Sequence, residues 1–145
     1  MANKTQSFDN HARFYPLWHF GAAPILTINV IVAAVALVRG PSLATGWQLL
    51  VAIALVLAIL ASRNMNIMTQ DRIIRGEERG RLRDLLPADM QASIPDLTTA
   101  QLIGLRFASD EEVPALTRQI LDGSLADKTA IKKAVKNWRA DHMRV

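Results

Sequence analysis

Two long apolar stretches dominate the pattern of hydrophobic and polar positions. Residues 17–38 form a run of 22 positions without Asp, Glu, Lys or Arg. A helix rises about 1.5 Å per residue, so this run can cross a hydrocarbon core of about 30 Å. A second uncharged run covers residues 41–62, but its most apolar part, residues 47–61, is short for a span. We predict a second span over residues 46–66, in which the aliphatic stem of Arg63 carries its guanidinium to the lipid headgroups.

The alternative for the second run is a helix buried in a soluble core. Between the runs, residues 39–46 contain Gly40, Pro41 and Gly46, which are typical of a tight connection. Two spans joined in this way place both ends of the chain on one side of the membrane. The prediction is an all-α fold with an N-terminal segment 1–16, a transmembrane hairpin 17–68 and a small helical bundle 69–145.

Basic residues indicate on which side the termini lie. The connector holds only Arg39, whereas eight Lys and Arg residues flank the other ends of the two spans. Cytoplasmic segments of membrane proteins are enriched in Lys and Arg, so we predict that both termini are cytoplasmic. The eight flanking residues are Lys4, Arg13, Arg63, Arg72, Arg75, Arg79, Arg81 and Arg83.

Aromatic and basic side chains at the ends of the runs are typical of a membrane interface. Phe14, Tyr15, Trp18 and Phe20 cluster where the first run begins, and Trp47 stands at the start of the second. Arginines that follow the second span suit anionic headgroups. The residues predicted to contact lipid headgroups or the interface are Trp18, Trp47, Arg63, Arg72 and Arg75.

Two polar or helix-disturbing residues interrupt the first run. Pro24 removes a backbone hydrogen bond and predicts a kink. Asn29 places an amide near the middle of the membrane, where the lack of a hydrogen-bond partner costs roughly several kcal/mol, so we expect it to face protein. Small residues at helical spacing favour close helix packing, although alanine is also simply common in membrane helices. The predicted packing residues are Asn29, Ala33, Ala36, Ala54, Ala58 and Ala61.

Apolar residues continue at helical spacing beyond the second run, which predicts that its helix extends to Pro87. Gly76 and Gly80 weaken this prediction and would mark a hinge or a close contact. Three shorter helices are expected after it. Their predicted caps and stops are Thr98 or Thr99 for a helix through Phe107, Ser109 with Glu112 as a capping box for a helix that ends at Gly123, and Asp127 for the last helix.

The last predicted helix is basic and amphipathic, with apolar positions from Ile131 to Trp138. Such a face could contact an acidic protein, lipid or nucleic acid, of which nucleic acid is the least favoured. The residues predicted to face a partner are Lys132, Lys136, Trp138 and Arg139.

The residues that usually carry chemistry form no recognisable site. Cysteine is absent, which excludes disulfides and thiolate metal sites. His11, His19 and His142 lack metal-site spacing, and headgroup contact is favoured over haem or pigment ligation for the one at the membrane, His19. No phosphate loop, nucleophile elbow or intramembrane ion pair is present in the sequence. We predict neither enzymatic activity nor a cofactor.

Four segments of the sequence resemble a known family: residues 6–14 (QSFDNHARF), 70–75 (QDRIIR), 105–112 (LRFASDEE) and 131–139 (IKKAVKNWR). The chain is similar to short two-span bacterial inner-membrane proteins of unknown function. The resemblance implies the hairpin and the attached helical domain, and it implies no activity.

The sequence thus favours an accessory or assembly subunit of a larger inner-membrane complex, with a respiratory or photosynthetic electron-transfer complex as the expected kind. Membrane lipids are the other expected partners. The alternative is a membrane-tethered module whose basic C-terminal helix recruits an acidic protein or nucleic acid.

Overall fold

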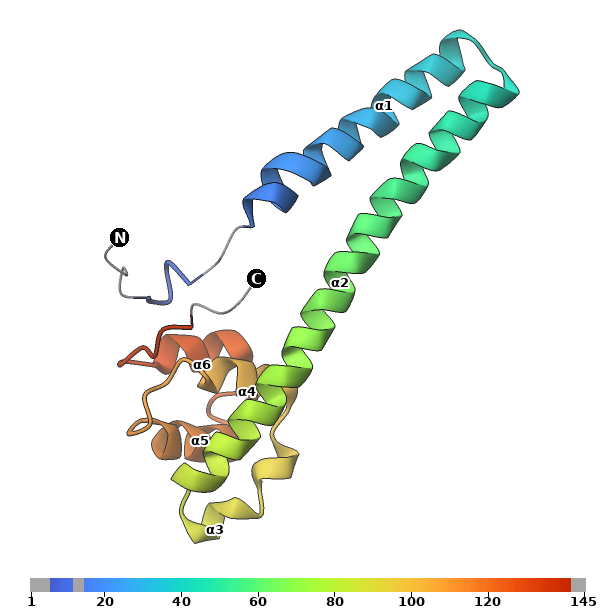
Figure 1. The fold of residues 1–145 in the computed structure, drawn as a ribbon. Helices are drawn as coiled ribbons and strands as arrows, with labels where there is room; N and C mark the ends of the chain where they lie inside the picture. The colour runs from blue at the N-terminus through green and yellow to red at the C-terminus, as the bar shows by residue number, and fades with distance from the viewer. Residues whose placement is uncertain (1–5, 12–14, 142–145) are drawn as a thin grey trace. The chain divides into compact units, whose positions relative to one another are not determined.

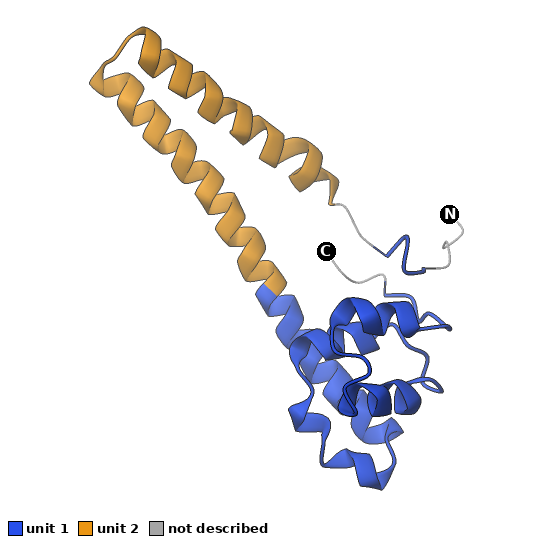
Figure 2. Ribbon diagram, turned by 180° about the vertical axis from the view of Figure 1, so that it is seen from behind, with its two compact units in different colours: residues 1–13, 68–144 blue, residues 14–67, 145 orange. Residues whose placement is uncertain are grey.

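The computed structural model describes residues 6–11 and 15–141. Every regular element among these residues is helical, so the prediction of an all-α fold is confirmed for them. The chain divides into two compact units, residues 14–67 with 145 and residues 1–13 with 68–144 (Figure 2). We call them the apolar unit and the C-terminal unit.

The apolar unit begins with a π-helical segment, η1 (Leu17–Ala22), followed by the α-helix α1 (Ala23–Arg39) (Figure 1). The N–H of Ala23 donates to the carbonyl of Trp18, five residues earlier. Pro24 consequently lies in the first turn of α1, directly after η1, so its missing N–H coincides with the change in hydrogen-bond pattern. The residue predicted to kink the span thus marks the change from π-helix to α-helix.

The second long helix, α2, covers Leu43–Leu85 and begins earlier than the predicted span. Ser42 and Thr45 stabilise its start, because the Thr45 N–H donates to Ser42 Oγ at 3.2 Å and the Ser42 N–H donates to Thr45 Oγ1 at 3.0 Å. The connection is therefore shorter than the predicted residues 39–46. Gly76 and Gly80 lie inside α2, and an added Cβ at either would meet nothing within 4 Å, so neither serves a close contact.

Within the apolar unit, α1 and the first part of α2 run side by side in opposite directions (Figures 1 and 2). Ala33 of α1 and Ala52 of α2 are the two buried residues of this pair, at 2% and 1% exposure. Their small side chains allow the two helix backbones to approach closely. The large apolar side chains of both helices are mostly exposed.

The C-terminal unit packs five short helices against the last turns of α2. They are α3 (Ala88–Gln91), η2 (Ile94–Asp96), α4 (Thr99–Leu105), α5 (Val113–Leu121) and α6 (Lys128–Ala134) (Figure 1). The hydrophobic core joins Leu82 and Leu86 to side chains from all of these helices, including Leu102, Leu116 and Ile131. The end of α2 is therefore an integral part of this unit.

Local capping signals fix most boundaries of the C-terminal unit. Thr98 forms a capping box with Gln101, and the Asp127 carboxylate accepts the N–H groups of Thr129 and Ala130, as predicted. After α5, Gly123 adopts a positive φ of 84°, which favours glycine and ends the helix.

The capping box predicted for Ser109 and Glu112 is wrong. The helix α5 starts at Val113, and its N-cap residue, Glu112, makes no side-chain cap bond. Its carboxylate instead accepts the N–H groups of Lys136 and Asn137, at 3.3 and 3.1 Å.

Candidate functional site

Two side chains of the apolar unit lie against the Trp18 ring. The guanidinium carbon of Arg63 lies 4.7 Å from the centre of the Trp18 ring, and the His19 ring meets the same indole edge-on at 4.8 Å. Arg63 was expected to reach the headgroups, and the structure places it over an aromatic ring of the neighbouring helix. A cation over an indole face is a favourable contact, and it ties α2 to η1.

The backbone of Tyr15, just before η1, contacts the imidazole of His19. Its Nδ1 lies 2.9 Å from the Tyr15 carbonyl oxygen, and the Tyr15 N–H donates to the same nitrogen at 3.1 Å. The contacts with Tyr15 and Trp18 hold the imidazole against its own helix. Within the described residues no group of three or more His, Cys, Asp or Glu side chains is placed to hold a metal ion.

Asn29 lies exposed on α1, near the middle of the first apolar helix. No hydrogen bond joins its side chain to another described residue. The hydroxyl of the nearby Thr27 has a hydrogen-bond partner within α1, because it donates to the Ala23 carbonyl oxygen at 2.8 Å. The amide of Asn29 is therefore the polar group that the apolar unit presents at mid-helix.

The other predicted packing residues divide between two faces. Ala33 is buried and Ala36 half-buried in the apolar unit. Ala54 and Ala58 are exposed, because they lie about 200° and 240° around α2 from the buried Ala52 at roughly 100° per residue. Ala61 is exposed as well. Ala33 and Ala52 are therefore the buried alanines of α1 and the first part of α2, and Ala54, Ala58 and Ala61 lie on an outer face of α2.

Other residues predicted at the membrane interface are exposed. Trp47 has 65% of its surface exposed. Arg72 and Arg75 are exposed on α2 in the C-terminal unit. Lys4, Arg13, Phe14 and His142 lie outside the described residues.

The C-terminal segment departs from the predicted helix. The helix α6 ends at Ala134, and Val135 is extended with φ −65° and ψ 123°. An isolated antiparallel bridge then pairs Trp138 with Ala108, and the Arg139 N–H donates to the Phe107 carbonyl at 2.8 Å. Together with the Glu112 carboxylate, these bonds satisfy backbone groups that a longer helix would have paired internally. The residues Lys136, Trp138 and Arg139 consequently share no helical face.

An aromatic cluster holds this segment against α4 and the N-terminal residues. The Trp138 and Phe107 rings lie 4.9 Å apart, and the His11 ring contacts both at 5.7 and 5.8 Å. Lys132 is only 5% exposed, and its Nζ lies 4.9 Å from the centre of the Phe107 ring. The lysine predicted to face a partner therefore lies in the interior, where the ring stabilises its charge.

A network of charged side chains surrounds a buried carboxylate of α2. Glu78 is 5% exposed and pairs with Arg81 at 3.0 Å and with Arg139 at 3.7 Å. Arg81 also pairs with Asp110 at 2.6 Å. Burial raises the pKa of Glu78 above its ordinary value, and the positive charges of Arg81, Arg139 and Arg106 oppose that rise. Sequence reasoning missed Glu78, although its spacing of three residues from Arg81 on one helix was a usable signal.

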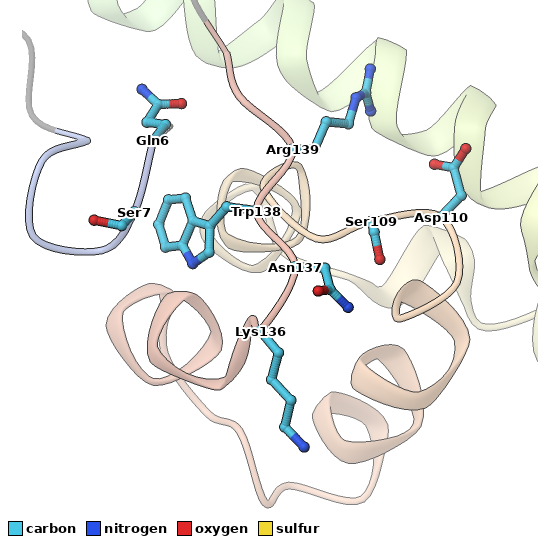
Figure 3. A pocket seen from close by; sticks show the side chains of 8 residues that line it. All are labelled: Gln6, Ser7, Ser109, Asp110, Lys136, Asn137, Trp138 and Arg139. Atoms are coloured by element: carbon cyan, nitrogen blue, oxygen red, sulfur yellow. The ribbon is translucent and has the colours of Figure 1, made fainter. Parts of the chain in front are cut away.

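A shallow open groove beside this network is lined by residues from three segments of the C-terminal unit (Figure 3). Lys136 and Arg139 extend away from each other in Figure 3, and Arg139 reaches toward α2. The hydroxyl of Ser109 is buried in this wall. The two cations do not converge, so the groove lacks a shared positive centre for an anionic ligand. The lining residues are Gln6, Ser7, Ser109, Asp110, Lys136, Asn137, Trp138 and Arg139.

A family model, described as a family of unknown function (DUF6526), matches residues 1–145. The chain belongs to the DUF6526 family. The match covers every element of both units, so the apolar helices and the C-terminal helices belong to one family architecture. Comparison of this DUF6526 chain with curated proteins finds no match, and comparison with solved structures finds none.

Proposed function

We propose that this chain is a non-catalytic accessory or assembly subunit of a larger bacterial inner-membrane complex. In this proposal α1 and the first part of α2 cross the membrane, and both termini lie in the cytoplasm. Two helices, Leu17–Arg39 and Leu43–Leu85, are long and apolar enough to cross a membrane, which by itself is weak evidence. The exposed apolar side chains of both helices add to it, because lipid is the environment in which such a surface is stable.

The observation that carries the proposal is the exposed amide of Asn29. A polar group at this depth has no water to bond with, and the described chain supplies no partner for it. Another membrane-embedded protein against this face of α1 would supply one. The exposed Ala54 and Ala58 offer a second surface where a partner helix could approach closely.

The predicted orientation follows from the distribution of basic residues. The connector between α1 and α2 has Arg39 at its edge, whereas Arg72 and Arg75 are exposed beyond the predicted second span. Segments rich in Arg beside a span favour the cytoplasmic side and its anionic lipids.

The alternative of a basic recruiting helix is less favoured. Its premise was a helical face that carries Lys132, Lys136 and Arg139. In the structure Lys132 is buried, the helix ends before Lys136, and Arg139 pairs with Glu78.

Replacement of Asn29 tests the proposal. The variant Asn29→Leu removes the amide and keeps a similar size, so we expect it to insert normally but to lose co-purifying membrane proteins in mild detergent. Asn29→Gln keeps an amide and is expected to retain them. Ile31→Leu, at another exposed position of α1, is the control for a change of surface shape. Equal recovery of partners with wild type and Asn29→Leu would contradict the proposed role.

A further inference from the structure

We propose that the hydrogen-bond partner of Asn29 is Asn29 of a second copy of this chain. The inference rests on the proposed membrane role, and it identifies the protein that contacts the Asn29 face of α1 as a second copy of the chain. Two copies would pack α1 against α1 about a two-fold axis, and the larger complex would be built on this pair.

The chemistry of the side chain supports a self-contact. An amide carries both N–H donors and a carbonyl acceptor, so two asparagines that face each other satisfy one another reciprocally. A carboxylate or a lysine at this position would lack that property, because two like charges repel. A two-fold interface uses the same patch on both subunits and therefore requires such a self-complementary group.

The position of Asn29 along the helix supports the same partner. Residues 23–39 and 49–61 contain no second amide side chain, and residues 49–61 contain no charged residue either. Two copies inserted in the same orientation hold every residue at equal depth. Asn29 of one copy therefore meets Asn29 of the other at its own level without any shift in register.

The residues around Asn29 form a surface that a second helix can cover. Ile25 and Val32 stand four residues before and three residues after Asn29, on the same side of α1, and are 64% and 59% exposed. Ala36, one turn farther along, is small and permits close approach. Ile31 is equally exposed, at 58%, but lies about 200° around the helix from Asn29. It provides a matched control on another face.

Disulfide formation between single cysteines tests this arrangement directly, because the natural chain has no cysteine. The variants Ile25→Cys, Val32→Cys and Ile31→Cys would be oxidised in native membranes, with the full-length chain. We expect covalent dimers from Ile25→Cys and Val32→Cys and none above background from Ile31→Cys. Addition of Asn29→Leu to Val32→Cys should weaken dimerisation about three- to thirty-fold, as expected for one interhelical hydrogen bond in lipid.

The outcomes separate this inference from the proposed function. Dimers absent from all three variants, or formed equally by Ile31→Cys and Val32→Cys, would overturn the two-fold contact. Loss of co-purifying proteins with Asn29→Leu would then still support the accessory role. If Ile25→Cys and Val32→Cys form dimers but no other membrane protein co-purifies in an Asn29-dependent way, the contact between two copies is supported and the proposed larger complex is contradicted.

Discussion

An added Cβ on Gly104 of α4 would lie 2.9 Å from the Cβ of Ile131 in α6. Real Cβ atoms do not approach so closely, so α4 and α6 pack at a separation that only glycine permits. Ile131 is fully buried and cannot turn toward solvent. Gly104 therefore sets how closely α4 and α6 can pack.

We predict that Gly104→Ala destabilises the C-terminal unit by about 1–3 kcal/mol, because the overlap forces the two helices apart. Hydrogen exchange of α4 and α6 amides in the detergent-solubilised protein would measure the loss. Gly80→Ala is the matched control, since a Cβ there meets nothing within 4 Å and alanine favours helix by about 1 kcal/mol. Equal protection of α4 and α6 in Gly104→Ala and wild type would refute the close packing.

A second prediction concerns Glu112, whose carboxylate accepts the N–H groups of Lys136 and Asn137. Glu112→Ala removes the acceptor of these two exposed N–H groups, so we expect a loss of about 0.5–1.5 kcal/mol in protection of the segment that follows α6. Exchange rates of the amides of residues 136 and 137 would report it. Glu111→Ala removes an exposed neighbour with the same charge and should leave those rates unchanged. If both variants exchange alike, Glu112 does not hold the segment.

The third prediction is a pH dependence that originates at Glu78. Its pKa is raised in the folded protein by burial, so the folded state binds more protons than the unfolded state above the ordinary glutamate pKa of about 4.3. The contribution of Glu78 to stability must then fall as pH rises from that value through the raised folded pKa.

Melting temperatures of the wild type and Glu78→Gln between pH 4 and pH 8, at about half-unit steps, would test this sign. We expect the wild type to lose stability relative to Glu78→Gln as pH rises, and Glu77→Gln, at an exposed position, to follow the wild type. A difference that stays constant or grows in favour of the wild type would mean that the ion pairs with Arg81 and Arg139 outweigh burial.

Features set by neighbouring residues could be predicted from the sequence. Thr98, Asp127 and Gly123 act on N–H and C=O groups within a few residues, so the local pattern identifies them. The two apolar helices could also be predicted from the sequence, because their lengths and apolar composition are enough to identify them.

Features set by distant residues could not be predicted. Glu112 binds backbone groups 24 and 25 residues away, and Val135 leaves the helix because Phe107 and Ala108 pair with the segment after it. The rotation of α2 about its own axis, which buries Ala52 and exposes Ala54, depends on how α1 packs against it. The spacing of small residues identifies candidate packing faces on a helix. It cannot decide which of two helix faces with similar composition is buried.

The central claim is that the chain crosses the membrane twice, with the connector after α1 on the side opposite the C-terminal unit. Pro41→Cys in the connector and Ala126→Cys between α5 and α6 place single thiols at exposed positions. A membrane-impermeant maleimide applied to intact spheroplasts should label Pro41→Cys, and it should label Ala126→Cys only after the membrane is opened. Labelling of both positions from the same side would contradict the two-span account.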